Sequence, residues 1–549
     1  MPRPAWVVVA MVSLLAGQTY APGPQVQIFI SDVDGNAQPY GLYVPRNFDA
    51  SKPYPLVISL HSEGSNHRLD LRRVFGRGNL FRQTDAEAAN GPFPPFPNVD
   101  YIVASPLARG SMGYRGIAEK DVYDVLNEVE KRFPIDPDRV YLTGASMGGG
   151  GALWLGLTRP DLWAAVAAVS PEAATGTEEL APNALDLPVR LFQGEEDPVV
   201  PAESSRKWRN LLQEAGVKVE YTEYPLVRHN SWDYAYRGAS IFNWFARFKR
   251  DRFPRQVRFL TRNYKYSSSY WVQLDGLTPG NVASMDASFT EPNRLLVRTQ
   301  GLDGFTLHLA GHPMYDVGRP AVIQVDGTEL KAGPRAALSF TKTDKGWLVA
   351  RYVRPSSAKG PGQEGPLREA LARKHLYVYG TADSPDEKEL ARRRAQAERA
   401  ANWAAPPYPL LLTLRAMADR DATEDDLKGA DLVLFGTRQT NSLIARFGGR
   451  LPIELNPSAA DYGLVEIAPA GDRYVLVNSG LAWWSGMDVA AKPGTAAPPA
   501  YKALLDLGDY VVFRRSLSSV VAAGTFDQDW KVPAGQAAKL AAAGVVQIR

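Results

Sequence analysis

The sequence predicts an α/β protein of several domains. At 549 residues the chain is too long for a single hydrophobic core. Strand-like and helix-like runs alternate in its first and last parts, as in parallel sheets covered by helices, and short alternating runs fill the stretch between them. We therefore predict an α/β domain at residues 22–254, a small β domain at 255–354, a linker at 355–373 and a second α/β domain at 374–549.

The first 21 residues have the pattern of an export signal. A positive charge at Arg3 precedes an apolar run from Ala5 to Ala16, and Thr19-Tyr20-Ala21 provides a small-residue cleavage pattern. The apolar run is too short to span a bilayer but suits a secretory signal. We therefore expect residues 1–21 to be a signal peptide and the protein to be secreted or periplasmic, without stable membrane insertion once the signal is removed.

Composition narrows the class of partner and cofactor. The chain has no cysteine, which excludes disulfides and thiolate metal sites. Its 62 basic and 59 acidic residues nearly balance, so we expect no nucleic-acid partner. No histidine or carboxylate spacing suggests a catalytic metal, and neither a dinucleotide-binding glycine motif nor a Walker lysine is present. We predict no metal and no cofactor, and the composition leaves the oligomeric state open.

The most informative segment is Gly144-Ala145-Ser146-Met147-Gly148. It follows an amphipathic helical pattern at 121–133 and a strand-like run at 139–143, and it precedes a glycine-rich helix start at 149–154. A serine between small residues in a sharp strand-to-helix turn is typical of a nucleophile elbow. Ser146 is therefore the candidate nucleophile. The alternative is a glycine-rich turn that only packs a helix close to a sheet.

A serine hydroxyl needs a base to take its proton, and the base needs an acid to orient it. In sheet enzymes of this type the acid and then the base follow the serine, on loops after later strands. Asp197 follows a strand-like run at 187–192, and His229 is the one histidine of six that follows a strand in the required window. We predict Asp197 as the acid and His229 as the base. Possible substitutes for Asp197 are Glu195, Glu196 and Glu223.

An oxyanion hole requires two backbone N–H groups directed at the developing negative oxygen. Met147, the residue after the candidate nucleophile, is expected to provide one. The strand-like run at 55–60 leads into the loop that begins at His61, so we expect Ser62 to provide the other, with Glu63 as the alternative. Trp232 and His61 are candidates for the substrate pocket, His61 alternatively as a packing residue behind it.

Over about residues 25–252 these segments resemble the α/β-hydrolase family. The similarity is to secreted esterases, including feruloyl esterases and polyhydroxybutyrate depolymerases, and to the catalytic domain of prolyl oligopeptidases. Ser62, where a second glycine is usual, and Ala145, where histidine or tyrosine often precedes the serine, depart from the family pattern. The resemblance implies a Ser-His-Asp hydrolase that forms an acyl-enzyme. The matching segments are Leu60 to Gly64, Ile135 to Gly149, Gly194 to Pro201 and His229 to Trp232.

The rest of the chain predicts two further domains. Short alternating runs at 255–354, with turn dipeptides such as Asp326-Gly327, predict a small β-sandwich or barrel. After a Pro/Gly-rich stretch at 355–366, a strand-Gly-Thr-helix unit begins at His375 and again at Asp431, which predicts a Rossmann-like or flavodoxin-like α/β domain. We expect that domain to cap the α/β-hydrolase domain or to hold a substrate.

The leading functional hypothesis is a secreted serine hydrolase that cleaves carboxylic esters of a small molecule or a polymer. A prolyl oligopeptidase-like serine peptidase is the alternative, because the same triad cleaves amides. A less favoured interpretation is a non-catalytic polymer-binding protein with an aromatic platform. Its candidate residues are Tyr264, Tyr266, Tyr270 and Trp271.

Overall fold

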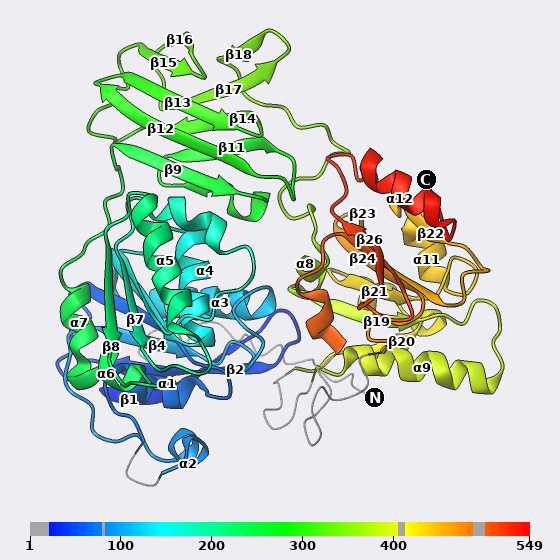
Figure 1. The fold of residues 1–549 in the computed structure, drawn as a ribbon, viewed down its shortest axis with the longest axis horizontal. Helices are drawn as coiled ribbons and strands as arrows, with labels where there is room; N and C mark the ends of the chain where they lie inside the picture. Colours follow the sequence, from blue (N-terminus) through cyan, green and yellow to red (C-terminus); the bar gives the residue numbers. More distant parts are fainter. Residues whose placement is uncertain (1–20, 80–82, 404–411, 487–499) are drawn as a thin grey trace, which may run out of the picture.

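The computed structural model describes residues 21–79, 83–403, 412–486 and 500–549 (Figure 1). The predicted signal peptide lies outside these ranges except for Ala21. Within them, no helix has the length and apolar character needed to cross a membrane. Figure 1 shows three regions, which we call the first (21–254), second (255–354) and third (355–549) region.

The first region is built on a mostly parallel sheet. Its strands are β1 (Gly23–Ile30), β2 (Ala37–Val44), β3 (Tyr54–Leu60), β4 (Ile102–Pro106), β5 (Ile135–Ala145), β6 (Ala165–Val169), β7 (Val189–Gly194) and β8 (Val219–Tyr224). In the described residues they form eight strands in the order β1-β2-β4-β3-β5-β6-β7-β8. The strands from β4 to β8 are parallel, and β1 and β2 add an antiparallel edge. Every residue of β3 and β4 is buried, as expected for strands covered on both faces.

Helices cover both faces of this sheet (Figure 1). They are α1 (His67–Val74), α2 (Asp85–Asn90), α3 (Ile117–Arg132), α4 (Met147–Thr158), α5 (Ala202–Glu214), α6 (Trp232–Ala235) and α7 (Ser240–Phe245), with short 3₁₀ turns at η1 (Glu178–Ala184) and η2 (Arg237–Ala239). All residues of α4 after Met147 are buried, because the helix begins directly after β5 and packs against β5 and β6. The predicted α/β character of this part of the chain is confirmed.

The second region consists of two facing sheets of short strands. Its elements are β9 (Gln256–Thr261), η3 (Tyr264–Tyr266), β10 (Ser268–Ser269), β11 (Val272–Leu277), β12 (Ala283–Glu291), β13 (Arg294–Gln300), β14 (Leu302–His308), β15 (Ala321–Val325), β16 (Thr328–Ala332), β17 (Ala337–Thr343) and β18 (Gly346–Leu348). Within the described residues one sheet has the order β10-β11-β14-β17-β18 and the other β16-β15-β13-β12-β9. Trp271, beside β11, packs against Phe289 of β12 with ring centroids 5.6 Å apart, which joins the two sheets.

The aromatic residues of the second region do not form an exposed platform. Tyr264, Tyr266 and Trp271 are buried, and the half-buried Tyr270 donates a hydrogen bond to the carbonyl oxygen of Pro160 at 3.1 Å. The Tyr266 hydroxyl donates to Glu119 of α3 in the first region. The platform hypothesis is therefore wrong, because these rings fill the core and the contact with the first region.

The third region contains a mixed sheet. Its elements are α8 (Leu367–Leu371), β19 (His375–Tyr379), α9 (Glu387–Ala401), β20 (Ala416–Ala418), α10 (Glu424–Leu427), β21 (Asp431–Phe435), α11 (Ser442–Phe447), β22 (Ile453–Leu455), β23 (Tyr462–Ala470), β24 (Arg473–Gly480), η6 (Ala500–Leu504), β25 (Tyr510–Arg514), β26 (Val520–Gly524), α12 (Ala534–Ala543) and β27 (Val546–Ile548), with further 3₁₀ turns at η4 (Asp419–Asp421) and η5 (Gly448–Arg450). Among the described residues the main sheet has the order β20-β19-β21-β24-β23-β25-β26.

Only half of this sheet follows the predicted Rossmann-like alternation. The strands β20, β19, β21 and β24 are parallel, whereas β23, β25 and β26 form antiparallel pairs. The difference arises at the connection between β23 and β24, where only Gly471 and Asp472 separate the strands. A two-residue turn can join antiparallel strands but not parallel ones.

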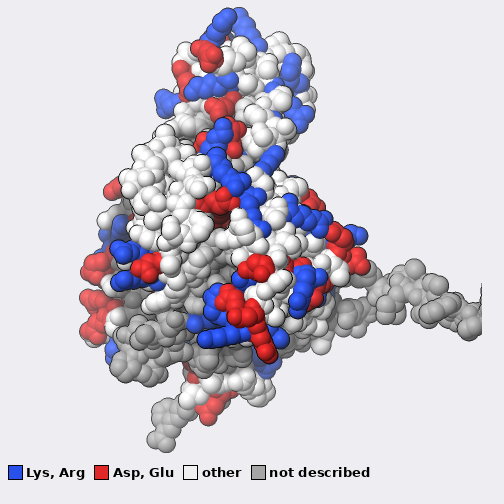
Figure 2. All heavy atoms as spheres, turned by 90° about the vertical axis from the view of Figure 1, so that its right-hand side faces the viewer, with Lys and Arg blue, Asp and Glu red and all other residues white. Residues whose placement is uncertain are grey.

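On the face shown in Figure 2, acidic and basic side chains lie next to one another.

The predicted linker is not a loose connection. The ammonium group of Lys359 is fully buried and forms an ion pair with Asp509, beside β25. Glu364 is also buried and accepts hydrogen bonds from the backbone amides of Tyr264 and Lys265 in the second region. Buried charges are retained where they are paired and hydrogen-bonded. The linker residues therefore attach the third region to the second.

Arg109 provides a test of the packing in the first region. Its guanidinium is fully buried, 2.8 Å from Asp34 and 2.8 Å from Asp121 of α3. Arg109→Leu leaves both carboxylates without this partner, and we expect the free energy of unfolding to fall by about 3–5 kcal/mol. Urea unfolding followed by tryptophan fluorescence measures this loss.

The matched control is Arg139→Leu, which removes an ion pair with Asp136 in which the arginine is 38% exposed. Exposed pairs contribute only about 0–1 kcal/mol. Equal effects of the two substitutions would contradict a special role for the buried cluster.

Candidate active site

Ser146 lies in a strained turn between β5 and α4. Its backbone has φ 55° and ψ −119°, a conformation that non-glycine residues rarely adopt and that costs on the order of 1–3 kcal/mol. Its amide donates to the Val169 carbonyl at 2.8 Å, which helps to hold the turn. Glycine is required on both sides. An added Cβ at Gly144 would lie 2.3 Å from the carbonyl oxygen of Gly148, and one at Gly148 would lie 2.0 Å from that of Leu60.

The imidazole of His229 lies between Ser146 and Asp197, within hydrogen-bonding distance of both. The Nε2 atom of His229 is 3.0 Å from Ser146 Oγ, and its Nδ1 atom is 2.8 Å from Asp197 Oδ2. The three side chains come from loops after β5, β7 and β8, at the carboxyl ends of parallel strands. This arrangement can pass a proton from the serine hydroxyl to the imidazole.

The carboxylate of Asp197 is buried, but several protein groups donate hydrogen bonds to it. Its Oδ1 accepts the backbone N–H groups of Val199 and Val200, both at 2.9 Å. Burial alone would raise the pKa of Asp197, but the hydrogen bonds from His229 and from these two amides outweigh it and lower the pKa. The carboxylate therefore stays ionised and can stabilise a positive charge on the imidazole.

The glutamates that the sequence left open are not in this position. Glu195 and Glu196 are exposed beside Asp197, and Glu195 accepts the backbone amide of Leu226. Glu223 forms an ion pair with Arg206. Of these four carboxylates, Asp197 is the one hydrogen-bonded to His229.

The two predicted oxyanion donors lie at the expected points of the fold. Met147 is the first residue of α4, and Ser62 lies in the loop after β3. In the described part of the chain, neither backbone amide donates a hydrogen bond to another protein group. The Ser62 hydroxyl accepts from Arg73 at 3.2 Å, and its carbonyl accepts the Ser65 amide at 3.0 Å, so the loop is fixed from two sides.

Trp232 and His61 have different positions. Trp232 packs edge-on against His229, with ring centroids 5.3 Å apart, and lines a cavity of about 560 Å³ with Arg73 and Asn230. His61 is fully buried, with its ring nitrogens 2.9 Å from the Ser62 carbonyl and 2.8 Å from the Leu107 carbonyl. The prediction of a pocket position for His61 is therefore corrected, because the ring supports the loop from behind.

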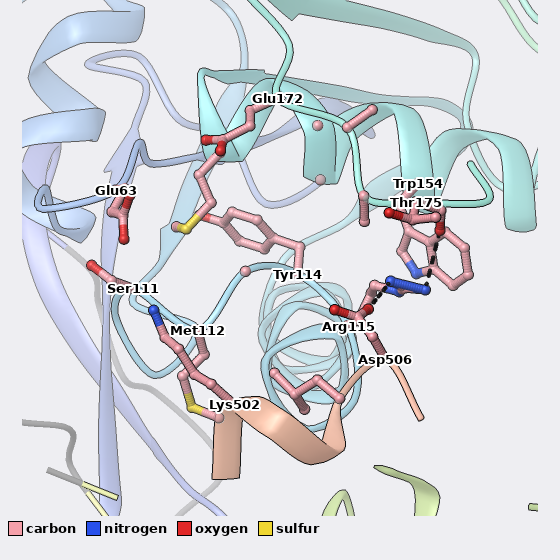
Figure 3. A pocket seen from close by; sticks show the side chains of 17 residues that line it. Glu63, Ser111, Met112, Tyr114, Arg115, Trp154, Glu172, Thr175, Lys502 and Asp506 are labelled. Atoms are coloured by element: carbon pink, nitrogen blue, oxygen red, sulfur yellow. Dashed lines mark hydrogen bonds and ion pairs between the residues drawn. The ribbon is translucent and has the colours of Figure 1, made fainter. Parts of the chain in front are cut away.

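A second cavity, of about 440 Å³, adjoins the elbow on the Met147 side (Figure 3). It is lined by residues of the first region and, on the opposite wall, by Lys502, Leu505 and Asp506 of the third region. Sequence reasoning missed this wall, because nothing in the local pattern near Lys502 signals a contact with a segment several hundred residues earlier. The lining from the first region is Glu63, Ser111 to Arg115, Met147, Gly150, Gly151, Trp154 and Glu172 to Thr175.

Among the residues that the structure describes, no group of three or more histidine, cysteine, aspartate and glutamate side chains lies in a position to hold a metal ion. The expectation that no metal takes part stays a prediction from the sequence.

The part of the chain that holds Ser146, Asp197 and His229 is similar to known proteins. Residues 123–239, which include the elbow, Asp197 and His229, match the family model described as "Putative esterase". Over 102 residues the chain is 32% identical to acyl-protein thioesterase 1 of Gibberella zeae, which covers 18% of this chain and 43% of that protein. The chain thus spans less than half the length of this curated relative.

Solved structures of esterases are also similar. A thermostable esterase is 26% identical with a TM-score of 0.33, covering 41% of this chain and 63% of its own. A ferulic acid esterase from Anaeromyces mucronatus is 18% identical with a TM-score of 0.31, covering 42% and 91%. The family match over residues 123–239 and the elbow in a mostly parallel sheet together support an α/β-hydrolase of the serine esterase type for the first region.

Proposed function

We propose that this protein is a secreted serine hydrolase that cleaves carboxylic esters. The observation that carries the proposal is the hydrogen-bonded sequence from Ser146 through His229 to Asp197, with separations of 3.0 and 2.8 Å. The match of residues 123–239 to an esterase family supports the choice of an ester. The proposal of export rests on the sequence pattern of residues 1–21.

The reaction begins with attack of Ser146 Oγ on the acyl carbon of the ester. His229 Nε2 takes the hydroxyl proton, while its Nδ1–H donates to the ionised Asp197. The tetrahedral oxyanion accepts hydrogen bonds from the backbone N–H groups of Met147 and Ser62. The imidazolium then gives its proton to the leaving alcohol, and the acyl group stays on Ser146.

Water completes the cycle. His229 takes a proton from the water as it attacks the acyl-enzyme, and a second tetrahedral oxyanion forms in the same hole. The collapse of this intermediate releases the carboxylic acid, and His229 returns the proton to Ser146 Oγ. No cofactor is consumed. A prolyl oligopeptidase-type peptidase is the alternative, and turnover of a matched ester and amide decides between them.

Ser146→Ala tests the nucleophile. We expect the wild-type protein to react covalently with a fluorophosphonate probe and to hydrolyse short-chain p-nitrophenyl esters. The alanine variant has no hydroxyl to be acylated, so labelling should vanish and kcat should fall by at least on the order of 10⁴. Ser519→Ala, at an exposed serine of the third region, is the control and should keep both. Labelling that persists in Ser146→Ala would place the nucleophile elsewhere.

Asp197→Asn tests the acid. The asparagine amide cannot accept the Nδ1–H of His229 with the same orientation and charge, so the imidazole loses its correct tautomer, and kcat should fall on the order of 10⁴-fold. Glu196→Gln, the exposed neighbour, should leave kcat within a factor of about two, since a surface substitution touches no reacting group. Steady-state kinetics with p-nitrophenyl acetate measures both. A similar, small effect of the two substitutions would reject Asp197 as the acid.

A further inference from the structure

We propose that the cavity of about 440 Å³ beside Met147 is the acyl-binding pocket, that the third region forms its far wall, and that it admits a compact, uncharged acyl group. This inference rests on the proposed esterase function. It assigns to the third region a direct part in substrate selection, through Lys502, Leu505 and Asp506.

The direction of the acyl group follows from the position of the base. The leaving oxygen must come within hydrogen-bonding distance of His229 Nε2 to receive its proton, so the alcohol part lies on the His229 side. The cavity lies on the other side: among the described residues its lining includes Met147, Gly150 and Glu63 but neither His229 nor Trp232. An ester whose carbonyl oxygen points at the Met147 amide thus directs its acyl group into this cavity.

The wall from the third region is held in place by specific contacts. Arg115 donates to Asp506 at 3.0 Å and lies 4.8 Å over the Trp154 ring, so it ties this wall to α4. The guanidinium of Arg368, in α8, donates to the Leu505 carbonyl at 3.2 Å. The preceding turn η6 is fixed by Tyr501, which stacks on Trp403 at 4.6 Å. The pocket is therefore formed by docked elements rather than by a chance gap between regions.

The lining predicts what the pocket accepts. In Figure 3, Tyr114 lies between two polar ends, one with Glu63, Ser111 and Lys502 and the other with Arg115, Asp506 and Thr175. Apolar lining also comes from Met112 and Met147. The apolar middle section favours an apolar acyl group. Its volume falls at the lower end of the range for small-molecule sites, about 300–1,000 Å³, which favours a compact acyl group.

The charges of the lining disfavour an anion. The charge of Arg115 is neutralised by its ion pair with Asp506. The other charged groups of the lining are the carboxylates of Glu63 and Glu172 and one ammonium, that of Lys502. The excess of negative charge repels an acyl group that carries its own carboxylate.

The test changes the far wall without touching the first region. Leu505→Trp places a larger side chain in the cavity, and Val520→Trp adds the same side chain at an exposed site of β26 as the matched control. For each protein, kcat/KM is measured for p-nitrophenyl acetate and p-nitrophenyl phenylacetate. We expect the ratio of phenylacetate to acetate to fall at least ten-fold in Leu505→Trp and to stay at the wild-type value in Val520→Trp.

Two further measurements make the test independent of one substitution. Leu505→Ala enlarges the cavity and should raise the same ratio at least three-fold. The wild-type protein should prefer p-nitrophenyl butyrate to the anionic p-nitrophenyl hemisuccinate by at least ten-fold in kcat/KM. Thermal unfolding of each variant establishes that the comparison is made on folded protein.

The outcomes separate this inference from the proposed function. If acetate is hydrolysed in a Ser146-dependent way but neither Leu505 variant changes the ratio, the composite pocket is wrong and the esterase proposal stands. Equal turnover of hemisuccinate and butyrate would overturn the preference for an uncharged acyl group. If no ester is hydrolysed by the wild-type protein, the proposed function itself fails.

Discussion

The close backbone approach at the β5–α4 turn is the constraint on which the rest of the site depends. A side chain at Gly148 would lie 2.0 Å from the Leu60 carbonyl oxygen, so only glycine lets α4 start this close to β3. That approach brings Met147 at the start of α4 near the loop that holds Ser62. It also fixes the strained backbone of Ser146, whose carbonyl accepts the Glu172 amide at 3.1 Å. The positions of the candidate nucleophile and of the two candidate oxyanion donors therefore depend on a single packing contact.

Hydrogen bonds, more than burial, decide which buried carboxylate keeps its charge. Burial raises the pKa of Asp121 to about 7, although Arg109 lies beside it. The pKa of Asp70 is likewise raised by burial, and its carboxylate accepts the Ser105 hydroxyl. Asp197 differs because His229 and two backbone amides donate to it, and its pKa is lowered. An acid that must stay ionised next to an imidazole needs this surplus of donors.

The contacts between regions converge on the helices that carry the site. Glu119 of α3 accepts hydrogen bonds from Trp154 of α4 at 3.2 Å and from Tyr266 of the second region, and Lys265 lies 3.4 Å from it. Arg115, which lies over the ring of the same Trp154, links α4 to the third region. The second and third regions thus act on the same side of α4, next to the cavity beside Met147. Their arrangement can shape a substrate pocket without contributing to the reacting groups.

Local sequence signals were sufficient to predict that the three residues of the proposed triad lie together. The glycine-flanked serine lies between a strand and a helix, and Asp197 and His229 follow later strands, so their chain order and their strand ends predict that they meet. The strands at His375 and Asp431 were predictable for the same reason. The local pattern could not exclude Glu195 and Glu196, which differ from Asp197 only in the direction that the loop gives each side chain.

Tertiary structure decided everything that depends on contacts distant in the chain. The burial of Tyr266, the antiparallel half of the third sheet, the inward position of Lys359 and the wall provided by Leu505 all depend on how separate regions pack. The period of a helix or strand reports which face of an element is apolar, but it does not identify the element that covers that face. The sequence by itself therefore determined the chemistry proposed for this protein, and only the packing of its regions determined the cavity proposed to hold its substrate.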